Sequence, residues 1–335
     1  MTDSAPRVTI SIINWNSASE TLRCLEAVEQ LSYRPLQLIV IDNGSRDDSV
    51  ERLQRWAAGG GGIAATVCES ESPTEQAHPT SGHCRVLVYP NATLLLADGN
   101  YGFCGGNNLS LAYALSAQTP PDYVFLHNND ARPRPDMLAR CVEAGCAADA
   151  GIIGAVMKDP DTNAVQFAGA RFPQELFFGG RLSIPEGRQP FYPVDRVEGS
   201  GIMIRRDVLE ARLADLGHYL DENLFIYCDE MELGAWAARH GYKTVMARDA
   251  VMHHAVSLSF GGKQQPGPTY YFTRNKMYVA RLWANPLTRA LFTLWYTPAM
   301  LLRSAQRLLQ RRPDLAEATF TGMLHGLAGV TGKRP

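Results

Sequence analysis

The N-terminal third of the chain alternates between short apolar runs and amphipathic segments. Residues 8–13 and 36–41 are largely apolar and rich in β-branched side chains, which is typical of parallel strands buried on both faces. Polar residues follow each run, and apolar residues then recur at helical spacing, as at Leu22, Leu25 and Val28. This succession of strand, polar turn and helix occurs twice. It predicts an α/β fold with a Rossmann-like, mostly parallel sheet flanked by helices and joined by right-handed crossovers.

A further buried strand is predicted at residues 123–126, and it ends abruptly in polar residues. His127, Asn128, Asn129 and Asp130 follow it directly. Ligands of open α/β sheets bind beyond the carboxyl ends of the strands, so these side chains are candidates for the site. Carboxylate and amide oxygens suit hard divalent cations. We therefore expect Asp130 to hold a metal ion and, through it, a phosphorylated substrate.

Three sequence patterns predict where helices begin. A Ser or Asp three residues before an acidic residue forms a capping-box pattern in Ser17–Glu20, Ser45–Asp48 and Asp229–Glu232. In the last of these, the side chain of Asp229 would bond to the backbone. Glu230 would then occupy the first helical position with its carboxylate free for chemistry.

Two segments interrupt the regular pattern. Residues 59–84 begin with four glycines and continue with Ser, Glu, Pro and His, which indicates an inserted surface loop. Residues 100–108 form a glycine-rich turn before a helix, and such a turn can bring backbone amides close to phosphate. This segment matches neither a dinucleotide fingerprint nor a P-loop. Pro133 and Pro135 predict the start of a further helix that runs to about Ala148.

The C-terminal region differs in charge from the rest of the chain. Eight basic residues and no acidic residue lie between positions 270 and 313, and residues 290–302 are uncharged and mostly apolar. Arg303, Arg307 and Arg311 recur every four residues. A basic amphipathic helix of this kind can lie on an anionic membrane surface. The same pattern also suits a helical appendage packed on the main domain, and both interpretations stay open.

Composition narrows the class of protein. The 335 residues are 45% hydrophobic and carry a formal net charge of −2, so no overall basic field points to nucleic acid. Seven cysteines without a Cys-x-x-Cys pair indicate reduced thiols, rather than a disulfide framework or a zinc site. No signal peptide and no transmembrane helix are predicted. We expect a cytoplasmic protein in which residues 1–270 form one domain and residues 271–335 a basic helical extension.

Five segments carry a family resemblance. They are VTISIINWN at 8–16, LIVIDNGS at 38–45, NYGFCGGNN at 100–108, FLHNND at 125–130 and LFIYCDEMELGAWAARHGY at 224–242. In this order and spacing they resemble the inverting family 2 glycosyltransferases of the GT-A fold, in particular the bacterial branch of rhamnosyltransferase-like and galactofuranosyltransferase-like enzymes. The resemblance covers about residues 7–270. It implies a GT-A domain followed by the C-terminal helical extension.

The resemblance implies a role for most of the strand-end residues. The nucleotide would lie against Asn14, Trp15, Asn16, Asp42, Asn43, Asn100, Gly102, Gly106 and Asn107. The sugar and diphosphate would contact Asn128, Asn129 and Lys263. Mg²⁺ or Mn²⁺ would bind Asp130 together with His253 or His254, of which we prefer His253. The metal motif of the family is Asp-x-Asp, so Asn128 departs from its first position.

Two acidic residues begin the helix of the last segment. Inverting transfer needs one carboxylate beside the acceptor hydroxyl, to take its proton as the oxygen attacks. By the resemblance this general base is Glu230, where the family usually has Asp, and Asp229 lies next to it. At the nucleotide, Asp42 would accept the imide N–H of uracil or thymine, although Asp and Asn there also simply favour a turn.

The resemblance implies an inverting, metal-dependent hexosyltransferase of cell-envelope polysaccharide biosynthesis. The donor would be a dTDP- or UDP-linked sugar, with dTDP-rhamnose slightly favoured. The acceptor would be a glycan or a lipid-linked hydroxyl, reached by peripheral contact with the inner face of the plasma membrane. Two alternatives stay open. One is a non-catalytic nucleotide-sugar-binding protein, which the Asn128 departure allows; the other is a sugar-phosphate nucleotidyltransferase, although residues 14–17 are not its basic, glycine-rich loop. No oligomeric state is indicated.

Overall fold

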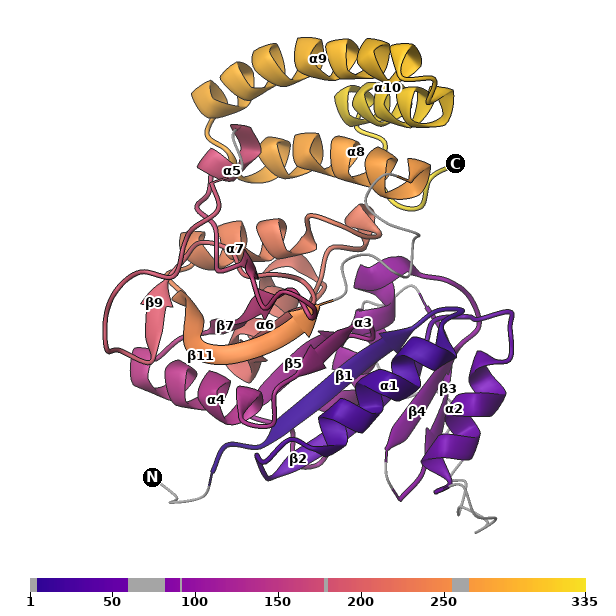
Figure 1. The fold of residues 1–335 in the computed structure, drawn as a ribbon, viewed down its shortest axis with the longest axis vertical. Coiled ribbons are helices and arrows are strands. Elements are labelled where there is room, and N and C mark those ends of the chain that lie inside the picture. Colours follow the sequence, from indigo (N-terminus) through magenta and orange to yellow (C-terminus); the bar gives the residue numbers. More distant parts are fainter. Residues whose placement is uncertain (1–4, 60–81, 91, 178–179, 255–264) are drawn as a thin grey trace.

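The computed structural model describes residues 5–59, 82–90, 92–177, 180–254 and 265–335 (Figure 1). Its strands are β1 (Val8–Asn14), β2 (Leu36–Asp42), β3 (Cys84–Val88), β4 (Thr93–Ala97), β5 (Tyr123–Asn128), β6 (Ala131–Pro133), β7 (Ile152–Lys158), β8 (Val165–Phe167), β9 (Phe191–Pro193), β10 (Gly201–Arg205) and β11 (Thr244–His254). Its helices are α1 (Ala18–Glu29), α2 (Ser49–Ala57), α3 (Gly102–Leu115), α4 (Met137–Ala148), α5 (Gln174–Phe177), α6 (Arg206–Leu216), α7 (Asp229–Arg239), α8 (Pro266–Trp283), α9 (Pro286–Leu309) and α10 (Pro313–Ala328).

All the strands of the described part belong to one sheet. Its order is β3-β4-β2-β1-β5-β10-β7-β11-β6, with β8 beside β7 and β9 beside β11. The neighbours β4, β2, β1 and β5 are parallel, and so are β7 and β11. Strand β10 runs antiparallel between β5 and β7. The predicted α/β class with a mostly parallel central sheet is confirmed.

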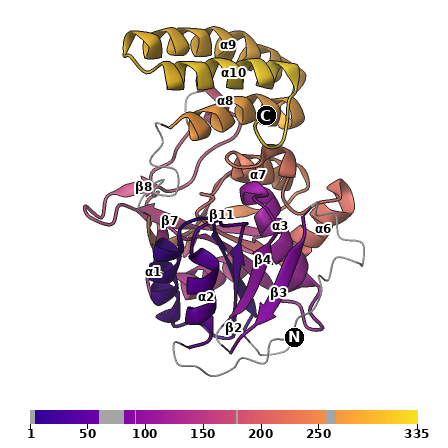
Figure 2. The same cartoon turned by 90° about the vertical axis from the view of Figure 1, so that its right-hand side faces the viewer.

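The sheet is covered on both sides and reverses its direction of winding beside β1. Figure 2 shows α1 and α2 on one side of the strands and α3 and α6 on the other. The side chains of Ile10, Ile12, Ile39 and Ile41 are fully buried between these layers, which explains the largely apolar runs of β1 and β2. The chain winds outward from β1 through β2 to β4 and then returns to β5 on the other side of β1. Such a switch point is where open sheets bind ligands.

The predicted capping boxes at α1 and α2 are wrong. Ser17 precedes α1, but its side chain makes no capping hydrogen bond. Glu20, its expected partner, forms an ion pair with Arg132 at 2.8 Å. Helix α2 begins after Asp48, so Ser45 lies outside it. In both cases a contact with a distant segment takes the side chain that the local pattern would have used at the helix end.

Two further boundaries differ from the expectation. The helix expected to start at Pro133 or Pro135 begins only at Met137, because Pro133 is the last residue of β6, an edge strand that pairs with Met252. Proline is tolerated on an edge strand, where its missing N–H is not needed. The glycine-rich segment that starts at Gly102 is the first part of α3 rather than a turn before it.

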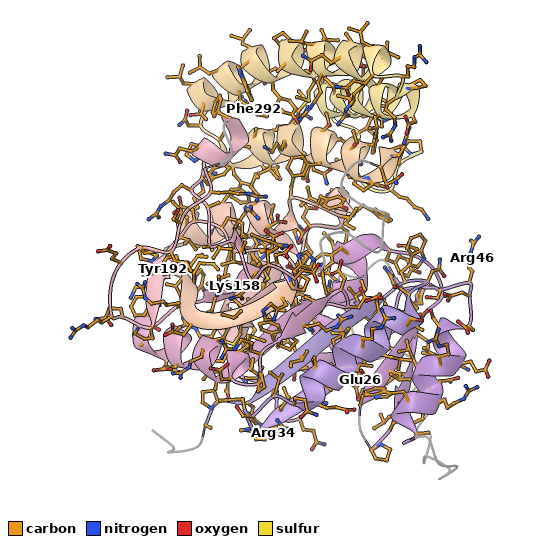
Figure 3. The ribbon with its side chains drawn as sticks, viewed as in Figure 1. Glu26, Arg34, Arg46, Lys158, Tyr192 and Phe292 are labelled. Carbon is orange, nitrogen blue, oxygen red and sulfur yellow. The ribbon has the colours of Figure 1, made fainter. Side chains whose placement is uncertain are left out.

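Helices α8, α9 and α10 form a layer of their own beyond the sheet. Figures 1 and 2 both show α9 as the outermost of the three. Phe292 lies on the inner side of α9, at the level of α5, with its ring edge-on to Phe177 at 5.7 Å (Figure 3). Helix α8 spans position 271, where we expected the extension to begin. Among the described residues, no helix has both the length and the apolar character needed to cross a bilayer.

Candidate active site

The carboxyl ends of β1 and β2 are joined by a buried hydrogen-bond network. Asn14 Nδ2 donates to Asp42 Oδ2 at 2.7 Å, across two strands that pair at these residues. The backbone amide of Ser45 donates to Asp42 Oδ1 at 2.9 Å, and its hydroxyl donates to Oδ2 at 2.6 Å. Asp42 is 2% exposed. Its Oδ2 accepts two of these hydrogen bonds and its Oδ1 accepts one, so Oδ1 keeps a lone pair for the N–H of a nucleobase.

The network continues to β5 through a residue that sequence reasoning missed. Thr21 Oγ1 on α1 donates to Asn14 Oδ1 at 2.6 Å and accepts a hydrogen bond from Asn129 Nδ2 at 2.9 Å. Thr21 is fully buried on the apolar face of α1. The position of Thr21, a polar residue on the apolar face of the predicted helix, could have indicated a role in the site. Asn129, which we expected to contact the sugar, is thus held against the nucleotide side of the site.

Asn43 connects these strand ends to the start of α3. Its Nδ2 donates to Gly102 O at 2.9 Å and to Asn100 Oδ1 at 3.3 Å, and its Oδ1 accepts from the amide of Tyr101 at 3.2 Å. Gly106 of α3 packs against Asn43 and the end of β1, since a Cβ at position 106 would be 3.1 Å from Asn43 Cγ and 2.6 Å from Ile13 Cδ1. Gly106 therefore serves the close packing of α3 on β1.

The amides at the start of α3 already have partners. Asn100 Oδ1 accepts from the amide of Gly102 at 2.8 Å, and the amide of Cys104 donates to Phe225 O at 3.2 Å. Gly102 has a φ of 72°, and a Cβ there would lie 2.3 Å from Phe225 O. Asn107 is buried and donates to Phe103 O at 2.9 Å. The segment before α7 therefore covers the start of α3 at Gly102 and Cys104.

Trp15 and Asn16 complete this edge of the sheet. Asn16 has a φ of 48°, a left-handed conformation that asparagine tolerates. Its amide donates to Ser45 Oγ at 2.8 Å, and its Oδ1 accepts from the amide of Arg46 at 2.8 Å. Trp15 next to it is half-buried. The residues predicted to hold the nucleotide, from the ends of β1 and β2 and the start of α3, are thus brought together.

Asp130 and Asn128 present buried oxygens that suit a cation. Within the described part of the chain, neither Asp130 Oδ1 nor Asn128 Oδ1 has a hydrogen-bond donor. His254 Nε2 lies 3.2 Å from Asp130 Oδ1, outside hydrogen-bonding geometry, and both side chains are largely buried. A buried carboxylate oxygen without a donor is costly unless a positive group meets it. An aspartate, an amide oxygen and an imidazole therefore fit a divalent metal such as Mn²⁺.

His254, rather than the His253 we preferred, faces Asp130. The end of β11 pairs with β6, which places His254 opposite Ala131 and His253 opposite Arg132. Successive residues of a strand point to opposite faces, so only one of the two histidines can face Asp130. Among the residues that the structure describes, no group of three or more His, Cys, Asp and Glu side chains forms a metal cluster. The protein would therefore supply only part of a metal coordination shell.

Asp229 and Glu230 lie side by side at the start of α7, against Gly199. A Cβ at position 199 would be 3.8 Å from Asp229 Oδ2 and 3.7 Å from Glu230 Oε2. Arg196, 5% exposed, donates from Nη1 to Glu230 Oε1 at 2.8 Å, while its Nη1 is 3.8 Å from Glu198 Oε2. Burial, and next the charge of Asp229, raise the pKa of Glu230 well above its ordinary value, and Arg196 opposes that rise. Burial raises the pKa of Asp229 to about 6.

The predicted capping box at α7 is wrong. The N-cap residue is Cys228, which makes no side-chain capping bond, so Asp229 and Glu230 are both already in the first turn. Glu232 instead forms a fully buried ion pair with Arg212 of α6 at 2.7 Å. Arg196 and Arg212 lie 34 and 20 residues before their acidic partners, so no local sequence pattern predicts either pair.

The backbone amide of Asn128 donates to Ser200 O at 3.2 Å, next to the Gly199 against which the acidic pair packs, so the pair lies close to the Asn128–Asp130 triplet. Tyr227 comes two residues before the pair in the chain. Burial, followed by the negative charges of Asp130, Glu230 and Asp229, raises the pKa of its phenol. All three carboxylates therefore act on the same side chain. Lys263, which we expected at the diphosphate, lies outside the described residues.

Two cavities occur elsewhere in the described part of the chain. One, of about 520 Å³, is lined among others by Arg134, Arg140, Lys158 and Arg248. The other has a volume of about 450 Å³ and lies beside β9 and the start of β11. Neither is lined by a residue of the candidate site. The site is therefore identified by its polar side chains at the sheet edge rather than by cavity size.

Comparison with known proteins identifies relatives over most of the chain. The family described as "Glycosyltransferase like family 2" matches residues 6–278. A low-salt glycan biosynthesis hexosyltransferase, Agl10, of Haloferax volcanii is 22% identical over 316 residues, covering 91% of this chain and 95% of the relative. An N-acetylglucosaminyl-diphospho-decaprenol L-rhamnosyltransferase of Mycobacterium tuberculosis is 24% identical over 281 residues, covering 76% of this chain and 77% of the relative.

Solved structures show the same fold. The mannosyltransferase PcManGT of Pyrobaculum calidifontis, in complex with GDP-Man and Mn²⁺, aligns over 97% of this chain and 88% of its own, with a TM-score of 0.58 and 17% identity. GalNAc-T7 with UDP, GalNAc and Mn²⁺ aligns over 98% of this chain and 57% of its own, with a TM-score of 0.62 and 11% identity. At these identities the likeness concerns the fold alone.

Proposed function

The chain belongs to the family "Glycosyltransferase like family 2" and is a glycosyltransferase, and on this premise we propose which reaction it carries out. It moves a sugar, with inversion, from a dTDP- or UDP-linked donor to a hydroxyl of a glycan or lipid-linked acceptor, and dTDP-rhamnose is the donor we favour. The observation that carries the proposal is the acidic pair Asp229 and Glu230, which packs against Gly199 beside the Asn128–Asp130 triplet. This grouping offers a proton acceptor and a metal ligand in one site.

Glu230 is the proposed general base. As the acceptor oxygen bonds to the anomeric carbon, the bond from that carbon to the diphosphate oxygen breaks, and the hydroxyl proton passes to Glu230. Arg196 holds Oε1 at 2.8 Å, which orients the carboxylate and favours its ionised form. Oε2, on the side of Gly199, is the oxygen that would take the proton. Asp229 raises the basicity of Glu230 by the repulsion between the two carboxylates.

The metal would be held by Asp130, with Asn128 and His254 beside it. A divalent ion would neutralise the charge that develops on the departing diphosphate. The donorless oxygens of Asp130 and Asn128 support this assignment. The Mn²⁺ in the structures of PcManGT and GalNAc-T7 also supports a divalent metal, Mg²⁺ or Mn²⁺. His254 replaces His253 as the histidine we assign to it.

The nucleotide would lie on the edge formed by Asn14–Asn16, Asp42–Asn43 and Asn100. The bonds of Asp42 to Asn14 and Ser45 support a preformed edge. The Mycobacterium relative acts, by its name, on a decaprenol-linked acceptor, which supports a lipid-linked acceptor here as well. Such an acceptor would bring the protein to the inner face of the plasma membrane as a peripheral protein.

Donor binding tests this function. Thermal unfolding with dTDP-, UDP- and GDP-sugars should show a Tm rise for the dTDP- or UDP-sugar only when Mn²⁺ or Mg²⁺ is present. A ligand at about 100 times its Kd stabilises the folded state by about 2.7 kcal/mol, which is easily measured. Donor hydrolysis should accompany binding. Binding without hydrolysis or transfer to any acceptor would instead favour a non-catalytic nucleotide-sugar-binding protein, and a response to GDP-sugars alone would refute the proposed donor class.

A further inference from the structure

The outer side of α9 is an exposed and wholly apolar surface. Only Phe292, Tyr296 and Met300 of its 24 residues are buried. Leu294 is 74% exposed and Leu309 is 86% exposed. The exposed apolar residues, which we call the α9 outer face, are Leu287, Leu291, Leu294, Trp295, Leu301, Leu302, Leu308 and Leu309.

These residues form one stripe along the helix. Their spacing of three, four and seven residues places them on one side of a helix with 3.6 residues per turn. Ala290, Pro298 and Ala305 fill the remaining positions of the stripe, so no charge interrupts it. At 1.5 Å per residue the helix is about 36 Å long. Monomeric soluble proteins rarely expose so long an apolar surface without a partner.

The arginines of α9 lie on the opposite side of the helix. At 100° per residue, Arg303 and Arg307 fall on the side of the buried Tyr296. Arg307 donates to Leu315 O of α10 at 3.1 Å. Arg311, which we expected on the same helical face, lies beyond the end of α9 and has a φ of 58°. The basic residues predicted on one helical face therefore lie on the side of α9 away from the apolar stripe.

The helical layer carries a charge opposite to that of the rest of the chain. Residues 265–335 contain ten lysines and arginines and two acidic residues, a formal net charge of +8. The whole chain carries −2, so residues 1–264 carry −10. An anionic surface would attract the helical layer and repel the remainder. The asymmetry therefore favours docking through α8–α10 in one orientation.

We propose that the α9 outer face docks on an anionic lipid bilayer and inserts its leucines between the headgroups and the acyl chains. An interfacial helix combines these features: an apolar face to bury, basic residues on its polar side and too little hydrophobicity to span the bilayer. A second copy of the chain is a poorer occupant, because two layers of charge +8 would face each other and the stripe offers no acidic residue. The proposal identifies the docking surface and is independent of the donor and its chemistry.

Vesicle flotation of the full chain tests the proposal. Wild type should float with vesicles of phosphatidylcholine and phosphatidylglycerol, less so at high salt, and much less with phosphatidylcholine alone. The combined change Leu294→Gln, Leu302→Gln and Leu309→Gln should lower partitioning about 10²-fold, because three leucines then leave the bilayer. The changes Val88→Thr and Val165→Thr, at exposed apolar positions of β3 and β8, are the control and should leave partitioning unchanged.

Three results would overturn the docking proposal. They are flotation of the triple variant equal to wild type, no flotation of wild type with anionic vesicles, and a concentration-dependent dimer in solution that the triple variant abolishes. The last would assign the face to a second copy. Metal-dependent donor binding in solution should be the same in wild type and the triple variant, so a failure of the docking proposal is distinguishable from a failure of the proposed reaction.

A second observation concerns the segment just before the acidic pair. Phe225, Tyr227 and Cys228 have φ values of 63°, 68° and 66°. This left-handed region is unfavourable for side chains of such size, and residues held in it persist only where their surroundings enforce it. The backbone from 225 to 228 is therefore strained directly before Asp229 and Glu230.

Two buried residues of α8 hold this segment in place. Asn275 Nδ2 lies within 2.9 Å of three carbonyl oxygens, those of Leu224, Ile226 and Tyr227. Arg274 Nη2 donates to Leu224 O at 3.0 Å, and its Nε donates to Asn275 Oδ1 at 2.8 Å. Both side chains are at most 1% exposed. The three carbonyls converge on one amide group because of the left-handed backbone.

We infer that Asn275, oriented by Arg274, is a positioning residue for Glu230. This inference rests on the proposed function. Without the amide, the three carbonyls lose a common donor and the strained backbone relaxes. The start of α7, and with it the Glu230 carboxylate, would then shift relative to Arg196 and Asp130.

The change Asn275→Ala should lower kcat about 10²-fold, as expected for a misplacement of the order of 1 Å, with KM for the donor nearly unchanged. The acid limb of the pH–rate profile should also move, since Glu230 loses its fixed distance to Arg196. Asn275→Ser keeps one donor and should be intermediate, which covers the case that the alanine variant does not fold. Thr273→Val on the same helix is the control. Unchanged kcat and pH profile in the folded serine or alanine variant would refute the positioning role, while metal-dependent donor binding by wild type tests the proposed function separately.

Discussion

Replacing Glu230 by glutamine is expected to lower kcat about 10²- to 10⁴-fold, the range that a positioned general base contributes. Glutamine keeps an oxygen that can accept the hydrogen bond from Arg196, so the side chain should stay in place. It cannot take the acceptor proton. Binding of the donor and of the metal should persist, because neither is assigned to this side chain. The measurement is the initial rate of sugar transfer beside donor affinity.

The direction in which the transfer rate of wild type changes with pH follows from the raised pKa of Glu230. The pKa of Glu230 is raised by burial and then by the charge of Asp229, and a base acts only when it is ionised. The rate should therefore fall as the pH drops through this raised pKa. Changing Arg196→Gln removes the charge that opposes the rise, so the acid limb should move to higher pH.

Thermal stability provides a control for the variant E230Q. A carboxyl group whose pKa is higher in the folded than in the unfolded chain contributes stability at low pH and loses it as the pH rises through the raised value. At a pH above the raised pKa the ionised Glu230 is therefore no net source of stability through ionisation, and E230Q should not lower Tm there. A variant E230Q with the wild-type rate, together with an inactive Asp229→Asn, would instead assign the base to Asp229.

The fold was largely predictable because its central strands are buried on both faces. A parallel strand covered by helices has a largely apolar run, as in residues 8–13 and 36–41, and that signal is local. The antiparallel β10, placed between β5 and β7, was not predictable. Its position depends on which strands pair with its two edges, and residues 201–205 alone do not predict those partners.

The capping boxes failed for a related reason. Glu20, Ser45 and Glu232 each have an intrahelical or turn role that the local sequence favours. In the structure Glu20 pairs with Arg132, Ser45 Oγ accepts a hydrogen bond from the amide of Asn16, and Glu232 pairs with Arg212. A tertiary partner supplies more than a cap bond when the side chain is buried. A local sequence pattern indicates the possible cap bond but not the competing tertiary contact, so it predicts the cap bond even where the tertiary contact forms.

The candidate site was predicted by residue type at strand ends, and this part agrees with the geometry. Asn14, Asp42 and Asn129 are linked by hydrogen bonds, and Asp130 lies beside a histidine. The residues that could not be predicted are those that hold the site residues in place, above all Thr21, Arg196 and Asn275. Each acts through a contact more than 30 residues away or through a buried face, so its role exists only once the chain is folded.

Asp130→Asn is expected to abolish the dependence of the reaction on metal and to lower kcat/KM about 10²- to 10³-fold. A metal ion contributes several kcal/mol by neutralising developing charge, and each 1.36 kcal/mol corresponds to about tenfold in rate. Asn128 brings no charge, so Asp130 is the carboxylate of the Asn128–Asp130 triplet and its loss is not compensated there. The measurement is a Mn²⁺ titration of sugar transfer in both proteins, with donor affinity measured at each metal concentration.

A matched change separates this effect from a general loss of charge. Asp136 precedes α4, lies near Arg134 and Arg140 and has no contact with the site, so Asp136→Asn should leave the Mn²⁺ titration unchanged. Asn128→Asp adds a second carboxylate beside Asp130 and should shift the titration to lower Mn²⁺ concentration. His254→Gln should shift it to higher concentration, because a side chain beside Asp130 is lost as a ligand. If D130N still titrates like wild type, the metal is held elsewhere, and the donorless oxygens of Asp130 and Asn128 must bind the sugar instead.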